Sequence, residues 1–135
     1  MHLWNVTAQI SSEGAEVIAT AQTIGLYSLL FLTQAIAKYA ISSKLKLTVI
    51  SNNMQLVTGQ ETIQPEKATL LGACKVIPQE YANIRCQSID IALADVTDIN
   101  NWQTQKLINN VYADLTSNIR EPVVAYRANR RWIQI

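Results

Sequence analysis

Residues 65–91 read PEKATLLGACKVIPQEYANIRCQSIDI, a helix-forming segment followed directly by a strand-forming one. Proline suits the first turn of a helix, and an acid such as Glu66 is stabilised there by the helix dipole. The apolar spacing predicts a helix from Pro65 to the neighbourhood of Pro78, whose buried face is formed by Ala68, Leu71, Ala73, Val76 and Ile77. Residues 84–91 alternate between two sets of side chains, which predicts a strand.

The segment that precedes this unit has the same strand–helix–strand order. Residues 3–7 alternate like a short strand, and the β-rich run 45–50 stops at Ser51. Between them the apolar residues of 16–39 have helical spacing, and one side is outlined by Ile24, Tyr27, Phe31, Ile36 and Tyr39. We expect this helix to be buried.

The segment that follows adds one more helix and a hairpin. Asp98 or Asn100 can cap a helix that runs to about Thr116. Residues 122–126 and 131–135 bracket Ala128-Asn129, a pattern typical of a hairpin turn. The order β-α-β-α-β-α-β-β predicts one α/β domain over residues 1–135. We expect a mostly parallel sheet with right-handed crossovers and an antiparallel C-terminal hairpin.

Composition excludes several classes of protein. The chain has 135 residues, enough for one domain, and its 49% of hydrophobic residues is too many for intrinsic disorder. A net charge of +1 provides no strong attraction to nucleic acid. Two cysteines, Cys74 and Cys86, are too few for a disulfide scaffold, and a single histidine, His2, gives little support to a metal site or a catalytic triad.

The glycines and the apolar stretches exclude two further kinds of site. With four glycines, at 14, 25, 59 and 72, the chain has neither G-x-G-x-x-G nor G-x-x-x-x-G-K to hold a phosphate. The apolar stretch 24–41 is interrupted by Gln34 and Lys38 and falls short of the roughly 20 apolar residues that cross a membrane. We expect no membrane span and a cytoplasmic location, which suits free thiols.

Three groups of residues keep the order and spacing of a known family. They are residues 65–81 with the strand 84–91, VVAYRANRRWIQ at 123–134, and LWNVT at 3–7 with LYSLLFLTQA at 26–35. Together they resemble the structural subdomain of the ketoreductase in modular polyketide synthases, over nearly the whole chain. The helix with its central Gly72 and terminal Glu80, followed by a strand that contains Asp90, is the most specific part.

The resemblance implies a non-catalytic role. Ketoreductases of that family have two Rossmann-like halves, and this chain resembles the structural half, a truncated Rossmann-like three-layer domain that binds no cofactor. The catalytic half holds NADP(H) and the Ser-Tyr-Lys-Asn active site that reduces β-ketoacyl-carrier-protein intermediates. The implied partners are that catalytic subdomain and neighbouring synthase domains in the same polypeptide. Some modules insert an enoylreductase between the halves, and others keep only a pseudo-ketoreductase, so these alternatives stay open.

The residues of this chain contain no reductase dyad. A short-chain reductase needs a tyrosine with a lysine four residues later, which lowers the pKa of the tyrosine. The tyrosines here are followed at that offset by Phe31, Ser43, Arg85, Thr116 and Arg130. We therefore expect that this chain alone is not an enzyme.

A basic and aromatic cluster near the C-terminus is the first candidate site. It contains Arg120, Arg127, Arg130, Arg131, Tyr126 and Trp132. We expect Arg127, Arg130, Arg131 and Trp132 to lie on a solvated or partner-facing hairpin, because charges at a sheet edge discourage association with other sheets. The alternative is that the arginines bind a phosphate.

Two other groups of residues are candidates for binding. Glu66, Lys67, Glu80 and Asp90 are expected to form ordinary ion pairs, with Arg85 or Lys75 as the partner of Glu80. The alternative function is a small-molecule or nucleotide-binding α/β domain. Open sheets bind ligands at the carboxyl ends of their strands, here near Thr7–Gln9, Ser51–Met54 and Asp90–Ala92.

Overall fold

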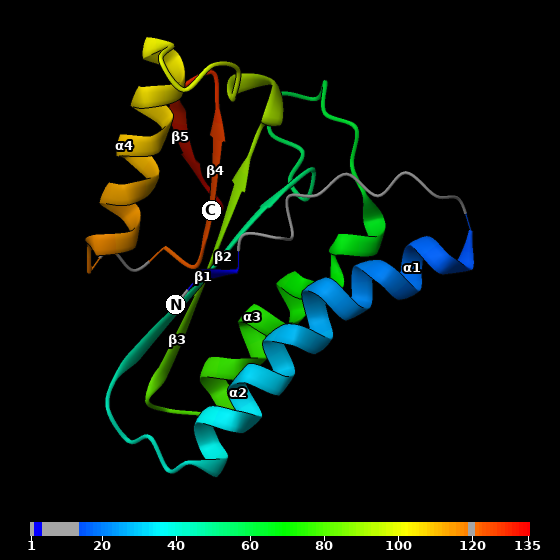
Figure 1. The fold of residues 1–135 in the computed structure, drawn as a ribbon, viewed down its shortest axis with the longest axis vertical. Coiled ribbons are helices and arrows are strands. Elements are labelled where there is room, and N and C mark those ends of the chain that lie inside the picture. The colour runs from blue at the N-terminus through cyan, green and yellow to red at the C-terminus, as the bar shows by residue number, and fades with distance from the viewer. Residues whose placement is uncertain (1, 4–13, 119–120) are drawn as a thin grey trace.

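The computed structural model describes residues 2–3, 14–118 and 121–135 (Figure 1). The elements of the chain follow the predicted order. They are β1 (His2–Leu3), α1 (Ala15–Gln22), α2 (Ser28–Lys38), β2 (Leu45–Asn52), α3 (Thr69–Glu80), β3 (Ile84–Ile91), α4 (Trp102–Thr116), β4 (Val123–Arg127) and β5 (Arg130–Ile133). A π-helical turn (Thr23–Tyr27) joins α1 to α2, and single 3₁₀ turns (Pro65–Lys67 and Leu93–Asp95) precede α3 and α4. Most of the strand predicted at 3–7, and the candidate ligand segment Thr7–Gln9, lie outside the described residues.

The strands form one five-stranded sheet in the order β1-β2-β3-β4-β5. The first four strands are parallel, and β4 pairs with β5 in antiparallel fashion. Ala128 and Asn129 connect that pair with φ angles of 48° and 59°. Positive φ at both central residues is the type I′ geometry that matches the twist of a two-residue hairpin. The mostly parallel sheet with an antiparallel C-terminal hairpin is confirmed.

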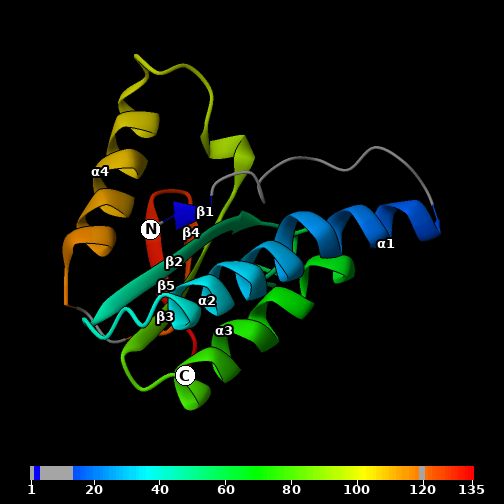
Figure 2. The same cartoon turned by 60° about the horizontal axis from the view of Figure 1, so that its bottom comes forward.

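Helices cover both faces of the sheet, so the domain has three layers (Figures 1 and 2). On one face α2 and α3 pack on β2 and β3 through a core cluster that includes Leu29, Leu47, Leu70, Ile77 and Ile84. On the other face α4 packs on β3 and β4 through Ile89, Ile91, Leu107, Val111 and Val124. Side chains that alternate along one strand therefore enter two separate cores.

The connection through α4 corrects one expectation about the topology. The parallel strands β1 to β4 run in one direction across the sheet, so the face on which a connecting helix lies sets the hand of its crossover. Since α2 and α3 lie on one face and α4 on the other, the α4 crossover has the opposite hand to the other two. The prediction of uniformly right-handed crossovers is wrong. On β4, the strand next to β3, the apolar side chains of Val124 and Tyr126 point to the face on which α4 lies, and α4 covers them.

The predicted helix 16–39 is present, but its buried side was predicted correctly only at Ile36. Of the predicted side, Ile36 is buried, but Tyr27, Phe31 and Tyr39 are 47%, 65% and 76% exposed. The buried stripe consists of Ala21, Gly25, Leu29, Thr33 and Ile36. An α-helix has about 3.6 residues per turn, so residues spaced four apart lie progressively further around the helix axis. The π turn, with its wider i→i+5 bonds, cancels that drift. It keeps residues 21, 25, 29 and 33 on one line.

The same helix bears on the membrane expectation. Of the helices in the described residues, Ala15–Lys38 is long and apolar enough, by length and composition alone, to cross a membrane. Its inner stripe is nevertheless part of the protein core, because Leu29 and Ile36 pack in the cluster that contains α3 and β2. The expectation of a buried helix is therefore right for one stripe and wrong for most of its surface.

Helices α3 and α4 lie close to their predicted ranges, but the buried residues of α3 and the cap of α4 differ from the prediction. In α3 the buried side chains are Leu70, Ala73, Cys74 and Ile77, whereas Val76 is 50% exposed. The cap of α4 is Asn101, whose side chain accepts a 2.8 Å hydrogen bond from the backbone N–H of Gln103. Both cysteines are buried and free, as expected of small core hydrophobes.

Candidate functional site

The candidate site lies at the carboxyl edge of the sheet, where β2, β3 and β4 end side by side. Asn52, Asp90 and Arg127 are the last or next-to-last residues of these three strands. The parallel register pairs Ser51 with Asp90 and Asp90 with Ala125, so the strand ends meet at one level. The loop 53–64 folds over this edge and adds Glu61. This is the edge at which open α/β sheets bind ligands.

Asp90 is at the centre of the edge and is completely buried. Its Oδ1 accepts hydrogen bonds from the backbone N–H of Met54 (3.1 Å) and from Ser51 Oγ (3.4 Å). Its Oδ2 accepts from the backbone N–H of Gln55 (3.2 Å) and from Arg127 Nη2 (2.5 Å). These four bonds match the four acceptor positions of a carboxylate. Asp90 therefore has no acceptor position left for a ligand.

Arg127 uses all of its donors within the protein, and only 7% of its side chain is exposed. Nε donates to Glu61 Oε1 (3.0 Å), and Nη1 donates to the carbonyls of Asp90 (3.2 Å) and Tyr126 (2.9 Å). Nη2 donates to Asp90 Oδ2 and to the carbonyl of Gln55 (2.8 Å). A guanidinium has five N–H donors. Phosphate binding would require Arg127 to break these internal bonds.

Glu61 ties the covering loop to Arg127. Its carboxylate accepts from the backbone N–H groups of Thr58 (3.0 Å) and Gly59 (3.1 Å) as well as from Arg127. The hydrogen bond from the Thr58 backbone is the main cause that lowers the pKa of Glu61 to about 2, and Arg127 adds to it. Gly59 has a φ of 84°, a conformation that a side chain would strain.

Lys67 completes the polar cluster from the 3₁₀ turn before α3. Only 4% of this residue is exposed, and its Nζ donates to Asn52 Oδ1 at 2.6 Å. Burial lowers the pKa of Lys67, while the charges of Asp90 and Glu66 oppose that shift. Asp90 forms the expected ion pair, and its partner is Arg127, whereas Lys67 donates to Asn52 in the same polar cluster. Glu80 is exposed, and the described part of the chain contains no ion pair between it and Arg85 or Lys75.

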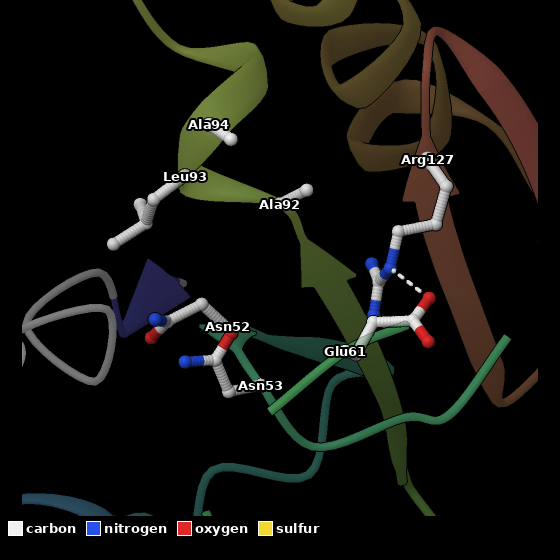
Figure 3. Close-up of a pocket in the computed structure, with 7 residues that line it drawn as sticks. All are labelled: Asn52, Asn53, Glu61, Ala92, Leu93, Ala94 and Arg127. Carbon is white, nitrogen blue, oxygen red and sulfur yellow. Dashed lines mark hydrogen bonds and ion pairs between the residues drawn. The ribbon is translucent and has the colours of Figure 1, made fainter. Parts of the chain in front are cut away.

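A cavity of about 270 Å³ remains beside this cluster (Figure 3). In the figure Asn52 and Asn53 lie across from Leu93, while Arg127 and Glu61 form the opposite end. The cavity is lined by Asn52, Asn53, Glu61, Ala92, Leu93, Ala94 and Arg127. It coincides with two of the strand ends named for the alternative function, Ser51–Met54 and Asp90–Ala92. Its two charged lining residues are paired with each other.

The predicted partner-facing cluster divides between two sides of the hairpin. The expectation is wrong for Arg127, which is buried because its side chain points to the side of the sheet covered by loop 53–64. Arg131 points to the other side and pairs with Asp114 of α4 at 2.9 Å, with 29% of its side chain exposed. Arg130, Arg131 and Trp132 are exposed, so the partner-facing role stays a prediction for these three.

Asp114 anchors a second polar cluster on the α4 face. It is 2% exposed and accepts a 2.6 Å hydrogen bond from the hydroxyl of Tyr126. Burial, followed by this bond to Asp114, raises the pKa of Tyr126. Lys46 Nζ donates to the carbonyls of Asp114 and Ser117 at the end of α4, where unpaired carbonyls favour a cation. This cluster holds α4 on the sheet.

Sequence reasoning named most of these residues but not their pairing. Glu61 was missed, and the only signal for it is its place in a polar loop opposite a strand end. Among the described residues, no group of three or more His, Cys, Asp or Glu side chains is arranged to hold a metal ion. The arrangement at the carboxyl edge is suited to clamping loop 53–64 onto the sheet.

The low pKa of Glu61 leads to a test of this clamp. A carboxylate whose pKa falls from 4.5 to about 2 on folding stabilises the fold fully above pH 4.5 and loses that contribution as the pH falls toward 2. We expect Glu61→Gln to be less stable than the wild type at neutral pH, and the difference to shrink between pH 4.5 and 2. Urea unfolding of both proteins across this range measures it. A difference that stays constant with pH would rule out the ionised clamp.

Comparison with known proteins gives one informative result. A scan against protein-family models gives no match, and neither does a search of curated proteins. A search of solved structures finds a chain described as "Adenylation, ketoreductase, and pseudo Asub multidomain structure of a keto acid-selecting NRPS module", with 30% sequence identity and a TM-score of 0.78. The match covers 98% of this chain and 11% of the solved chain.

The likeness confirms the three-layer, Rossmann-like α/β fold. It also supports the coarser part of the family expectation, a ketoreductase-related subdomain within a multidomain biosynthetic protein. The similar structure is an NRPS (nonribosomal peptide synthetase) module, so the polyketide synthase remains a prediction. This chain is similar, over almost its whole length, to one segment of a module that contains a ketoreductase.

Proposed function

We propose that this chain is a non-catalytic structural subdomain of a ketoreductase within a multidomain synthetase or synthase. The observation that carries the proposal is the likeness over 98% of the chain to a segment of a ketoreductase-containing module. The sequence adds support, since it has no tyrosine–lysine dyad and no glycine-rich phosphate loop. In this role the chain supports a separate catalytic half, which binds NADP(H) and transfers the hydride to a ketone.

The carboxyl edge of the sheet supports a scaffolding role. In a nucleotide-binding α/β domain this edge offers unpaired donors to the ligand. Here Asp90 and Arg127 form their hydrogen bonds with each other and with loop 53–64. The result is an edge whose central charges are paired with each other. The proposed host is an NRPS-type module or a polyketide synthase in the cytoplasm, and the scaffolding role is the same in an intact ketoreductase and in a pseudo-ketoreductase.

The alternative function is a small-molecule or nucleotide-binding domain, and the cavity at the strand ends favours it. The two functions differ in what NADPH, NADP or ADP does to the stability of the purified chain. A ligand at about 100 times its Kd stabilises a folded protein by roughly 2.7 kcal/mol. We expect thermal melts with and without these nucleotides to coincide. A saturable rise in melting temperature would favour the alternative.

The reading frame around this chain provides the positive test. We expect it to encode a segment with both G-x-G-x-x-G and a tyrosine–lysine dyad, or to lack both in a pseudo-ketoreductase. Where the segment exists, its ketone-dependent oxidation of NADPH should require this chain, supplied on the same polypeptide or added to it. Oxidation of NADPH by the 135-residue chain alone would contradict a scaffolding role.

A further inference from the structure

The outer side of the α1–α2 helix is an exposed stripe with aromatic residues at its centre. Figures 1 and 2 show α1 and α2 as one rod along the outside of the helical layer, beside α3. Opposite the buried stripe, exposed residues recur every three or four positions. This outer stripe consists of Glu16, Ala19, Thr23, Tyr27, Phe31, Gln34 and Lys38.

Two properties of the outer stripe point to a protein surface as its occupant. Residues 17–37 contain no charged side chain, although nine of these 21 residues are exposed and seven more are half-buried. Tyr27 and Phe31 stack on each other with ring centroids 6.2 Å apart, which presents one flat aromatic patch. Exposed aromatic residues in a charge-free setting are typical of the centre of a protein interface.

The charges of the outer stripe lie at its two ends and have opposite signs. Glu16 and Lys38 are each eleven residues from Tyr27, so Tyr27 lies at the midpoint between them and Phe31 one turn further along. At about 1.5 Å per residue, each charge is roughly 16 Å from that midpoint. A second, antiparallel copy of the stripe centred on Tyr27 would place Glu16 of each copy beside Lys38 of the other. A parallel copy would instead place like charges together.

We propose that the outer stripe is a self-association surface on which a second copy of this chain packs its own α1–α2 helix in antiparallel orientation, centred on Tyr27. A two-fold contact uses the same patch on both copies and needs a self-complementary surface, which this stripe is. Antiparallel helices that cross at a shallow angle of roughly 20° keep their ends within reach of long side chains. This inference does not depend on the proposed function.

A membrane is the competing occupant, and the buried stripe argues against it. Insertion of the helix would remove Leu29 and Ile36 from the core that they form with α3 and β2. Surface binding would leave Glu16 and Lys38 without the partners that the antiparallel contact provides. The membrane is therefore treated as an outcome of the test.

The first test measures the oligomeric state of the 135-residue chain by sedimentation over a range of concentrations. We expect a monomer–dimer equilibrium, and we expect Phe31→Asp to raise the dissociation constant at least about tenfold, since hot-spot losses are of that size. Tyr112→Asp is the matched control, because Tyr112 is also 65% exposed but lies on α4, across the sheet. Melting curves of the variants establish that each remains folded.

The second test determines the orientation of the two helices. We expect Glu16→Lys and Lys38→Glu each to weaken the dimer by up to about tenfold, and the double variant to restore it, because surface ion pairs are individually weak but each occurs twice. A chain that stays monomeric at its highest soluble concentration would overturn the proposal. So would a dimer insensitive to Phe31→Asp, or a double variant as weak as the single ones. Monomer that sediments with phosphatidylcholine vesicles would assign the stripe to a membrane instead.

Discussion

Replacing Arg127 with methionine is expected to lower the free energy of unfolding by about 3–5 kcal/mol, the usual cost of leaving one member of a buried ion pair without its partner. Asp90 is completely buried, and Arg127 Nη2 forms an ion pair with its carboxylate at 2.5 Å. For a domain of this size, this corresponds to a fall of roughly 10–20 °C in melting temperature. Urea and thermal unfolding measure both quantities.

Two variants separate the buried pair from general effects on the hairpin. Arg130→Met removes an exposed arginine three residues away, and we expect it to change stability by less than about 0.5 kcal/mol. Asp90→Asn with Arg127→Met removes both charges, and we expect the double variant to be more stable than the sum of the single losses implies. A cost of Arg127→Met below about 1 kcal/mol would show that the carboxyl edge does not depend on this ion pair.

Leu29→Ala is expected to cost about 2–5 kcal/mol, because Leu29 has no exposed surface and lies in the core between α2, α3 and β2. Phe31→Ala removes a larger apolar side chain from the same helix, yet we expect it to cost less than about 1 kcal/mol, since Phe31 is 65% exposed. Both are measured by urea unfolding at concentrations where the chain is monomeric.

The pair of variants tests which side of the helix carries the fold. A larger loss from Phe31→Ala than from Leu29→Ala would mean that the stripe of residues 27 and 31 is the packed one. That was the interpretation suggested by the apolar spacing alone. Equal losses would contradict the division of this helix into a buried stripe and an outer stripe.

Much of the fold was predictable because local patterns determine local conformation. The alternation at 84–91 predicts β3 with its observed ends, Ile84 and Ile91. The Ala128-Asn129 pair, between two β-rich runs, predicts the hairpin. Apolar residues that repeat every two positions indicate a strand, and those that repeat every three to four indicate a helix. Both patterns involve only residues close together in the sequence, so a single sequence is enough to detect them.

The candidate site was less predictable because its contacts join residues far apart in the chain. Asp90 and the segment Ser51–Met54 were named, but the pairing of Asp90 with Arg127 joins positions 37 residues apart. Arg127 resembles its neighbours Arg130 and Arg131 in the sequence. Strand register and the path of loop 53–64 decide that it is buried and that they are not.

The sequence by itself determined the order of the elements, the mostly parallel sheet, and the absence of a reductase dyad and of a phosphate-binding glycine loop. Only the tertiary structure decided the side of the Ala15–Lys38 helix that is buried, the hand of the α4 crossover and the internal ion pair at the carboxyl edge. The physical reason is that each of these depends on what packs against a surface. A single π turn changes which side of a helix faces the core, and the face of the sheet that carries apolar side chains decides where α4 packs. Neither changes the local apolar pattern in the sequence.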